Sequence, residues 1–253
     1  MKTVSLLFHD VYEADPRESG FASDAADRYK LSVREFDAQL SGLKDVPPGG
    51  VAMTVDDGGV SYYTQVADRL EAHGWRGHCF VSTDFIGTRG FLDARQLREL
   101  DARGHVIGSH SASHPRRISA CTPDAIRREW AGSRRVLEDL LGHEVSVASV
   151  PGGYHSGEVA RAAREAGLRA LFTSQPTRTV REEQGCTVMG RFTIRRGDPL
   201  DLARRLLLPS PWARRAAWAS WNAKGLVKPL LGQSYGRVAD WVLAGRTCTR
   251  DHA

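Results

Sequence analysis

Short apolar segments alternate with amphipathic segments along most of the chain, and this alternation limits the possible folds. Apolar runs at 51–55, 79–81 and 145–150 have the length of buried strands. Each precedes a segment with helical spacing of apolar residues that ends at a glycine. Strands joined by such helices form a parallel α/β sheet, either open or closed into a barrel. Functional side chains are then expected at the carboxyl ends of the strands.

Two regions depart from this alternation. Residues 10–50 separate the first predicted strand from the second and contain one clear helix, which begins with the capping box Ser32-Val33-Arg34-Glu35. Residues 191–253 carry 12 Lys/Arg against 4 Asp/Glu, whereas residues 1–190 carry 23 against 26. We predict a main domain at 1–198 with an insertion at 10–50, followed by a basic, Trp-rich helical tail at 199–253. The tryptophans of this tail are Trp212, Trp218, Trp221 and Trp241.

The composition excludes several classes of protein. Apolar residues make up 41% of the chain and charged residues 26%, which is typical of a globular domain and not of a disordered or collagenous one. Its four cysteines form no CxxC pair, so a zinc ribbon is excluded. A nucleic-acid binder is not expected either, because the acidic balance of residues 1–190 leaves no continuous basic footprint.

Two adjacent carboxylates end the predicted strand at 51–55. Asp56 and Asp57 precede Gly58-Gly59, and an Asp-Gly pair by itself is typical of a turn. Here the pair also lies between a buried strand and a helix, which places both side chains at the functional edge of the sheet. Like charges this close raise one pKa unless a cation keeps the group ionised. A metal ion on one carboxylate and general-base chemistry for the other would resolve this conflict.

A pair of histidines follows the predicted strand at 106–107. His110 and His114 are separated by three residues, a spacing that lets both imidazoles reach one ion. A single histidine in this place would more often be structural. Two imidazoles and one carboxylate form a facial triad with open coordination positions, which is typical of a catalytic zinc or similar divalent site.

Together the two motifs resemble those of the polysaccharide deacetylases, the chitooligosaccharide deacetylase homology group or carbohydrate esterase family four. Met53-Thr54-Val55-Asp56-Asp57-Gly58 is similar to the first motif of that family, and 110–115 is similar to the second. The resemblance covers residues 3–194 and implies Asp56 as the base, with Asp57, His110 and His114 as metal ligands. We therefore predict a distorted (β/α) barrel of about seven parallel strands with a helical C-terminal tail.

The third motif of the family, an arginine followed by Pro-Pro-Tyr-Gly, is altered in this chain. The segment Ser149-Val150-Pro151-Gly152-Gly153 aligns with it, so Ser149 stands where the family has the arginine that orients the base. Gly152 stands where the family has tyrosine, and its backbone N–H can still stabilise an oxyanion. Gly153, Tyr154 and His155, which continue this loop, are the candidates for contacts with the substrate.

The resemblance also implies a general-acid histidine near the last strand, but the predicted strand at 188–194 contains none. Phe8-His9-Asp10-Val11 is similar to the Tyr-His segment at the start of the biofilm poly-N-acetylglucosamine deacetylases, whose acid motif is permuted to the N-terminus. First and last strands are neighbours in a closed barrel, so a histidine from either can reach the same point. We predict His9 as the acid. A core or turn histidine is the alternative, and Asp10 either orients His9 or begins the loop.

These residues predict a metal-dependent hydrolase that removes N-acetyl groups from an amino sugar in a polysaccharide, oligosaccharide or glycan precursor. We expect one divalent ion, Zn²⁺ in the first place, with Co²⁺, Ni²⁺ or Mn²⁺ as alternatives. Two other functions stay open. One is removal of a formyl or other acyl group from a lipid-linked or small amide. The other is glycan binding without catalysis, against which the complete set of base and ligands argues.

Residues 1–8 form too short an apolar run for a secretory signal, which predicts a cytoplasmic location. The tryptophans and arginines of the tail suit an anionic membrane surface, so we expect peripheral contact with the inner face of the membrane. The alternative is that the tail packs on the main domain as a helical cap.

Overall fold

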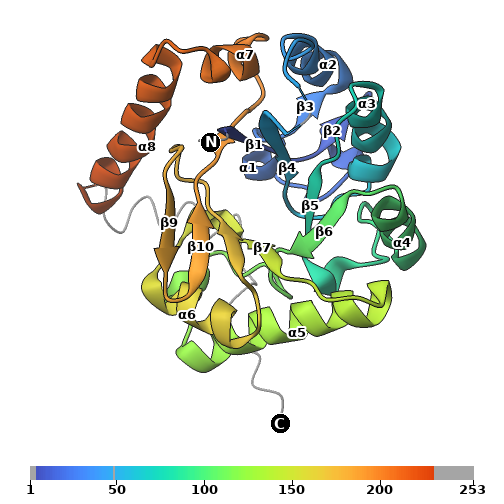
Figure 1. Cartoon of the computed structure of the whole chain (residues 1–253), viewed down its shortest axis with the longest axis vertical. Helices are drawn as coiled ribbons and strands as arrows, with labels where there is room; N and C mark the ends of the chain where they lie inside the picture. Colours follow the sequence, from blue (N-terminus) through green and yellow to red (C-terminus); the bar gives the residue numbers. More distant parts are fainter. Residues whose placement is uncertain (1–3, 48, 231–253) are drawn as a thin grey trace.

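The structure, a computed structural model, describes residues 4–47 and 49–230, and its centre is a curled, mostly parallel sheet (Figure 1). In order of pairing, the nine strands of this sheet in the described residues are β11 (Phe192–Thr193), β1 (Val4–Phe8), β4 (Val51–Val55), β5 (His78–Val81), β6 (Val106–Ser109), β7 (Val147–Ser149), β8 (Ala170–Phe172), β10 (Cys186–Met189) and β9 (Val180–Glu183). Only β9 runs antiparallel to its neighbour. The predicted α/β class and distorted-barrel architecture are confirmed, with nine strands where about seven were expected.

The predicted last strand at 188–194 is divided in two. β10 pairs with β8, whereas β11 pairs with β1 through Leu6 and Phe192, so the chain crosses between the two ends of the curled sheet. Gly190 lies in this crossing, where a Cβ atom would come within 2.4 Å of the Gln175 carbonyl oxygen. Only glycine fits such a close approach of two backbones. The first and last parallel strands are nevertheless neighbours, as the barrel hypothesis requires.

Helices cover the outer face of the sheet. Their ends follow from local sequence signals: Ser32 caps α2 with the predicted capping box, and α5 begins at Pro123 behind the Thr122 cap. Gly142 ends α5 with a left-handed φ of 78°. The helices around the sheet are α2 (Val33–Ser41), α3 (Ala67–Ala72), α4 (Ala94–Ala102), α5 (Pro123–Leu141) and α6 (Gly157–Glu165).

The insertion at 10–50 is ordered by a buried lysine. Its short strands β2 (Val11–Tyr12) and β3 (Leu31–Ser32) pair with each other, and the four-residue helix α1 (Asp24–Asp27) lies between them. Lys30 donates from Nζ to the carbonyl oxygens of Pro16, Ser19 and Phe21 at 2.6–2.8 Å. A buried ammonium group that donates to several carbonyls fixes the loop beside the carboxyl end of β1.

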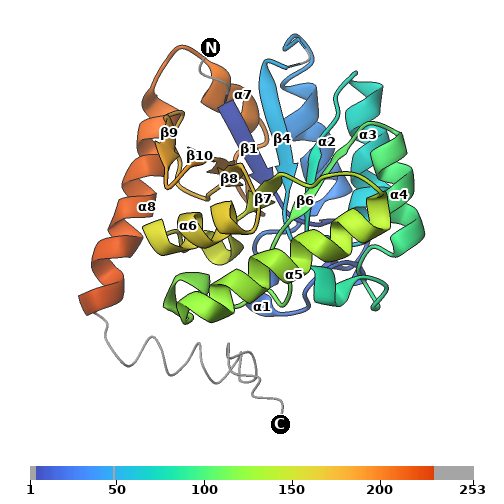
Figure 2. The same ribbon diagram turned by 60° about the horizontal axis from the view of Figure 1, so that its bottom comes forward.

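The tail begins with two helices. α7 (Leu202–Leu207) packs Ala203 and Leu206 into the core, and α8 (Trp212–Leu230) runs along the side of the barrel away from α3 and α4 (Figure 2). No helix in the described ranges is long and apolar enough to cross a membrane. The rest of the predicted tail, residues 231–253 with Trp241, lies outside the described residues.

Candidate active site

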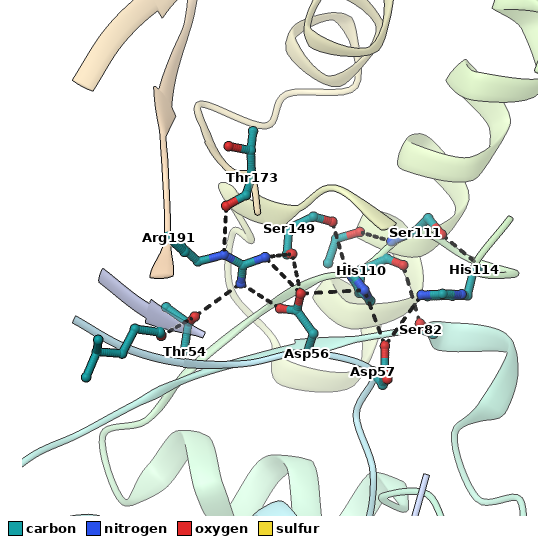
Figure 3. A network of polar contacts seen from close by, with 12 residues as sticks. Thr54, Asp56, Asp57, Ser82, His110, Ser111, His114, Ser149, Thr173 and Arg191 are labelled. Carbon is teal, nitrogen blue, oxygen red and sulfur yellow. Dashed lines mark hydrogen bonds and ion pairs between the residues drawn. The ribbon is translucent and has the colours of Figure 1, made fainter. Parts of the chain in front are cut away.

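Polar side chains gather where neighbouring strands end at their carboxyl edge. Asp56 and Asp57 follow β4, His110 follows β6, and Ser149 ends β7. The pairing order places β4, β5, β6 and β7 side by side, so residues far apart in sequence meet at this edge (Figure 3). The structure thus brings the first two sequence motifs together at the edge where they were expected.

One carboxylate and two imidazoles form a cluster with metal-ligand spacing. Asp57 Oδ1 lies 3.4 Å from His110 Nε2 and 3.4 Å from His114 Nε2. The three candidate ligand atoms all lie within 4.8 Å of one another, and Asp57 and His110 are buried. A carboxylate with two imidazoles is a donor set that suits zinc and similar divalent ions, so these residues fit the expected metal.

The backbone around this cluster is unusual. In the described part of the chain, positive φ at a non-glycine residue occurs at Asp57 (78°), Ser111 (66°), His114 (53°) and Gln184 (52°). Three of these four residues therefore belong to the cluster or its loop. Such conformations are disfavoured for residues with a side chain, and they persist where the surrounding structure holds them in place for a function.

His110 is oriented by the backbone of β7. Its Nδ1 lies 2.8 Å from the Ser149 carbonyl oxygen, which can only accept a hydrogen bond. Nδ1 therefore carries a proton, and Nε2 is left to face Asp57. A metal-ligating histidine is commonly fixed in this way by a second partner on its other ring nitrogen. Glu129 holds the loop between the two histidines by accepting from the N–H groups of Ala112 and Ser113.

The pKa values of both carboxyl groups are lowered despite burial. Burial alone would raise the pKa of Asp57, but a hydrogen bond from His110 and the charges of His9 and His114 outweigh it. Burial likewise opposes ionisation of Asp56, and the charge of Arg191 is the main effect that lowers its pKa. Both groups are therefore ionised over the physiological pH range, as the predicted ligand and the predicted base must be.

Arg191 was not among the residues predicted from the sequence. Its guanidinium lies opposite Asp56, with Nη1 2.7 Å from Oδ1 and Nη2 2.8 Å from Oδ2, and the side chain is fully buried. Two signals could have pointed to it: the arginine missing at position 149, and the Gly190-Arg191 pair inside an apparent strand.

His9 is half-buried at the end of β1. Its ring centroid lies 4.9 Å from that of Tyr29, and His9 is one of the groups that lower the pKa values of Asp56 and Asp57. Its Nδ1 atom is buried and has no hydrogen-bond partner among the described residues. Asp10 does not orient it: the Asp10 carboxylate accepts from the hydroxyls of Ser19 and Ser61 and so belongs to the loop.

The third-motif loop is a tight turn with two left-handed glycines. Gly152 has a φ of 60°, and a Cβ there would lie 3.1 Å from the Tyr154 ring. Gly153 has a φ of 71° and lies beside Trp221 of α8, whose ring would come within 3.3 Å of an added Cβ. His155 faces Glu183 on β9, with its Nε2 at 3.0 Å from Oε2. The roles of Gly152, Gly153, Tyr154 and His155 stay predictions.

Comparison with known proteins decides the family. Residues 44–171, about half of the chain, match the family model described as polysaccharide deacetylase. The chain belongs to the polysaccharide deacetylase family. Within this family, YxkH of Bacillus subtilis is 25% identical over 167 residues, which cover 66% of this chain and 59% of that protein. A chitooligosaccharide deacetylase of Sinorhizobium fredii is 31% identical over 144 residues, 54% of this chain and 64% of the relative. The chain thus spans less than two thirds of either relative.

Solved structures of deacetylases share the fold. The deacetylase PplD of Streptococcus pyogenes superposes with a TM-score of 0.66 at 18% identity, over 82% of this chain and 98% of PplD. IcaB of Ammonifex degensii superposes with a TM-score of 0.62 at 21% identity, over 86% of this chain and 96% of IcaB. These similarities support the distorted barrel of this polysaccharide deacetylase family member.

Proposed function

We propose that this protein removes N-acetyl groups from amino sugars of a glycan in a metal-dependent hydrolysis. The observation that carries the proposal is the position of Asp56. This carboxylate is buried and ionised, and its Oδ2 lies 3.8 Å from Nε2 of His110, which belongs to the metal-ligand cluster. A base beside residues that can hold a metal ion is an arrangement that suits metal-assisted amide hydrolysis, whereas a pure glycan-binding module has no use for it.

Asp57, His110 and His114 would hold the ion. When bound, a divalent ion would supply Lewis acidity and would lower the pKa of the reacting water toward ~7. Asp56 accepts the proton of the attacking water, because it is ionised and oriented toward the cluster. The Gly152 N–H donates to the oxygen that gains charge, and His9 donates a proton to the departing amine nitrogen. Acetate and a free amino sugar result.

The test is a direct assay of the products. Purified protein loaded with Zn²⁺ is incubated with a panel of N-acetylated oligosaccharides and lipid-linked N-acyl amino sugars, and the products are analysed by mass spectrometry. The proposal predicts loss of acetyl groups from at least one glycan and no such loss after treatment with a chelator. A protein with full metal content that leaves every acetyl group in place contradicts it.

A second candidate, removal of an acyl group from a lipid-linked amino sugar, is favoured by the surface of α8. Trp212 is 72% exposed and Trp218 is 55% exposed, and the Arg215 guanidinium lies over the Trp212 ring at 5.7 Å. No acidic residue occurs between Asp201 and Asp240. An exposed basic and aromatic helix face suits the interface of an anionic membrane. We propose that this face, defined here by Trp212, Arg215 and Trp218, holds the barrel at the inner membrane surface.

Trp221 does not belong to that face. It is half-buried and lies beside Gly153, so α8 also places one aromatic ring next to the third-motif loop. Of the tryptophans of the tail, Trp221 is therefore not part of the face proposed to contact a membrane. The helix period explains the difference, because positions 213, 217 and 221 share one side of α8, and Ala213 and Ala217 pack against the core.

A further inference from the structure

Arg191 enters the barrel at an unusual place, the crossing between β10 and β11. The crossing is held closely, since the Arg191 N–H donates to the Gln175 carbonyl at 2.9 Å and Gly190 leaves no room for a side chain. From this point the side chain extends inward between the end of β4 and the end of β7 (Figure 3). Its position therefore depends on the division of the last strand.

Every N–H group of the guanidinium has an acceptor. Nε donates to the Thr173 carbonyl oxygen at 3.1 Å, and Nη1 donates to Thr54 Oγ1 at 3.1 Å. The other contacts are the two to Asp56 and one from Nη2 to Ser149 Oγ at 2.7 Å. Five contacts use all five donors that an arginine possesses. The guanidinium therefore has one orientation in this site.

This orientation fixes the plane of the candidate base. The two Nη atoms meet the two oxygens of Asp56 in a fork, and Ser149 Oγ donates a further hydrogen bond to Oδ2 at 3.0 Å. Two parallel N–H···O bonds hold a carboxylate in one plane, whereas a lysine ammonium acts as a single point of charge. Asp56 is thereby directed toward the metal-ligand cluster.

Ser149 contacts both the Arg191 guanidinium and the His110 ring. Its short side chain leaves the space that the Arg191 guanidinium fills, while its backbone carbonyl fixes His110. We propose that Arg191 is the positioning residue of the base Asp56, the role that the resemblance gives to an arginine at position 149. The inference rests on the proposed function, because it assigns the group that orients its base.

Four variants test the positioning role. Arg191→Ser removes the guanidinium, and Arg191→Lys keeps a buried cation. The double variant Arg191→Ser/Ser149→Arg places an arginine near Asp56 from position 149 on β7. Arg169→Ser is the control, because Arg169 is an exposed arginine at the other end of the sheet that pairs with Glu144. For each we would measure metal content, kcat and KM of deacetylation, and both constants again with millimolar guanidinium added.

We expect Arg191→Ser to bind metal normally, to keep its KM and to lose about 10²-fold in kcat, since misplacement of a catalytic group by ~1 Å costs that much. Guanidinium and the relocated arginine should each restore part of kcat. Arg191→Lys should also have a low kcat. This variant tests the positioning role if Arg191→Ser does not fold. Full kcat in Arg191→Lys, or a folded Arg191→Ser that neither guanidinium nor Ser149→Arg improves, would overturn the proposal.

A readout without substrate separates this inference from the proposed function. Millimolar guanidinium should raise the thermal midpoint of Arg191→Ser in a saturable way, because a ligand that binds only the folded state stabilises it. The same concentrations should not raise the midpoint of the wild type or of Arg191→Ser/Asp56→Asn. If the wild type deacetylates no glycan, the proposed function fails, while this measurement still tests the guanidinium site on Asp56. Equal midpoint shifts in all three proteins would refute that site.

Discussion

At the scale of single residues, the two neighbouring carboxylates of the candidate site have different partners. Asp57 is within 3.4 Å of both imidazoles, whereas Asp56 is held by Arg191 and Ser149 and lies 3.8 Å from His110. One carboxylate thus belongs to the cluster with the two imidazoles, and the other is oriented by its own hydrogen bonds. Substitutions at the two positions should therefore have different effects.

The first prediction concerns the base. Asp56→Asn should keep the metal, because Asp56 is not one of the three clustered ligands, and should lose deacetylation by roughly 10²–10⁴-fold, since an amide cannot accept the proton. Metal analysis together with steady-state kinetics measures both properties. Asp68→Asn is the control, because Asp68 is an exposed carboxylate paired with Arg103. If Asp56→Asn turned over as fast as this control, Asp56 would have no part in the mechanism.

The second prediction concerns the acid. His9→Ala should fold and bind metal, but it should slow amide hydrolysis much more than hydrolysis of esters with good leaving groups. The reason is that the amine must receive a proton to depart, whereas such an alkoxide or phenoxide need not. The comparison of kcat for an N-acetyl and an O-acetyl substrate measures this difference, with His143→Ala as an exposed control. Equal losses on the two substrates would make His9 a structural residue.

At the scale of elements, α3, β5 and β6 are joined by a buried histidine remote from the active site. His105 Nδ1 lies 2.8 Å from the Tyr62 hydroxyl and accepts from the Gly77 N–H, while Nε2 faces Glu71 at 3.0 Å. Nδ1 must stay unprotonated to accept the Gly77 hydrogen bond. Burial is the main cause that lowers the pKa of His105 below its ordinary value of 6.5, although Glu71 opposes this effect.

The third prediction follows from this lowered pKa. Below the unfolded pKa of 6.5 the unfolded chain binds a proton at His105 that the folded protein resists, so the free energy of unfolding falls as the pH drops through this range. His105→Gln should lose this part of the pH dependence. Urea unfolding of both proteins at about pH 7.5 and about pH 5.5 measures it. An identical pH dependence in the two proteins would show that His105 does not titrate as described.

The fourth prediction concerns helix α8. The wild type should sediment with anionic liposomes at low salt and be released at high salt, because surface charges are screened beyond a Debye length of ~8–10 Å. Trp212→Ser/Trp218→Ser should bind less. Val136→Ser/Val180→Ser, which removes exposed apolar residues from other parts of the surface, should bind like the wild type. Absence of binding to anionic and neutral liposomes alike would leave α8 as a helical cap.

At the scale of the whole molecule, the sequence was sufficient to predict those features of the fold and the site that depend on local signals. The parallel sheet, the capping box at Ser32 and the meeting of two motifs at one edge all follow from periodicity and from the rule that strand ends share an edge. Charged β9 has no apolar alternation in Val180–Glu183 and was not predicted as a strand. Arg191 was missed for a different reason, because its role depends on a backbone crossing that no local pattern specifies.

The same distinction applies to α8. Composition correctly indicated a helix rich in tryptophan and arginine, but only the packed structure separates the exposed Trp212 and Trp218 from Trp221 beside Gly153. Which side of an amphipathic helix contacts the domain is determined by the neighbouring surface, and that surface is built from residues far away in sequence.

We propose that Asp57, His110 and His114 form one divalent metal site next to Asp56. The most direct measurement is the metal content of purified wild type and of His110→Ala/His114→Ala, determined by plasma mass spectrometry after dialysis against a metal-buffered solution. We expect one bound divalent ion per wild-type chain and its loss from the double variant, with the fold retained in both. Equal metal content in the two proteins would contradict it.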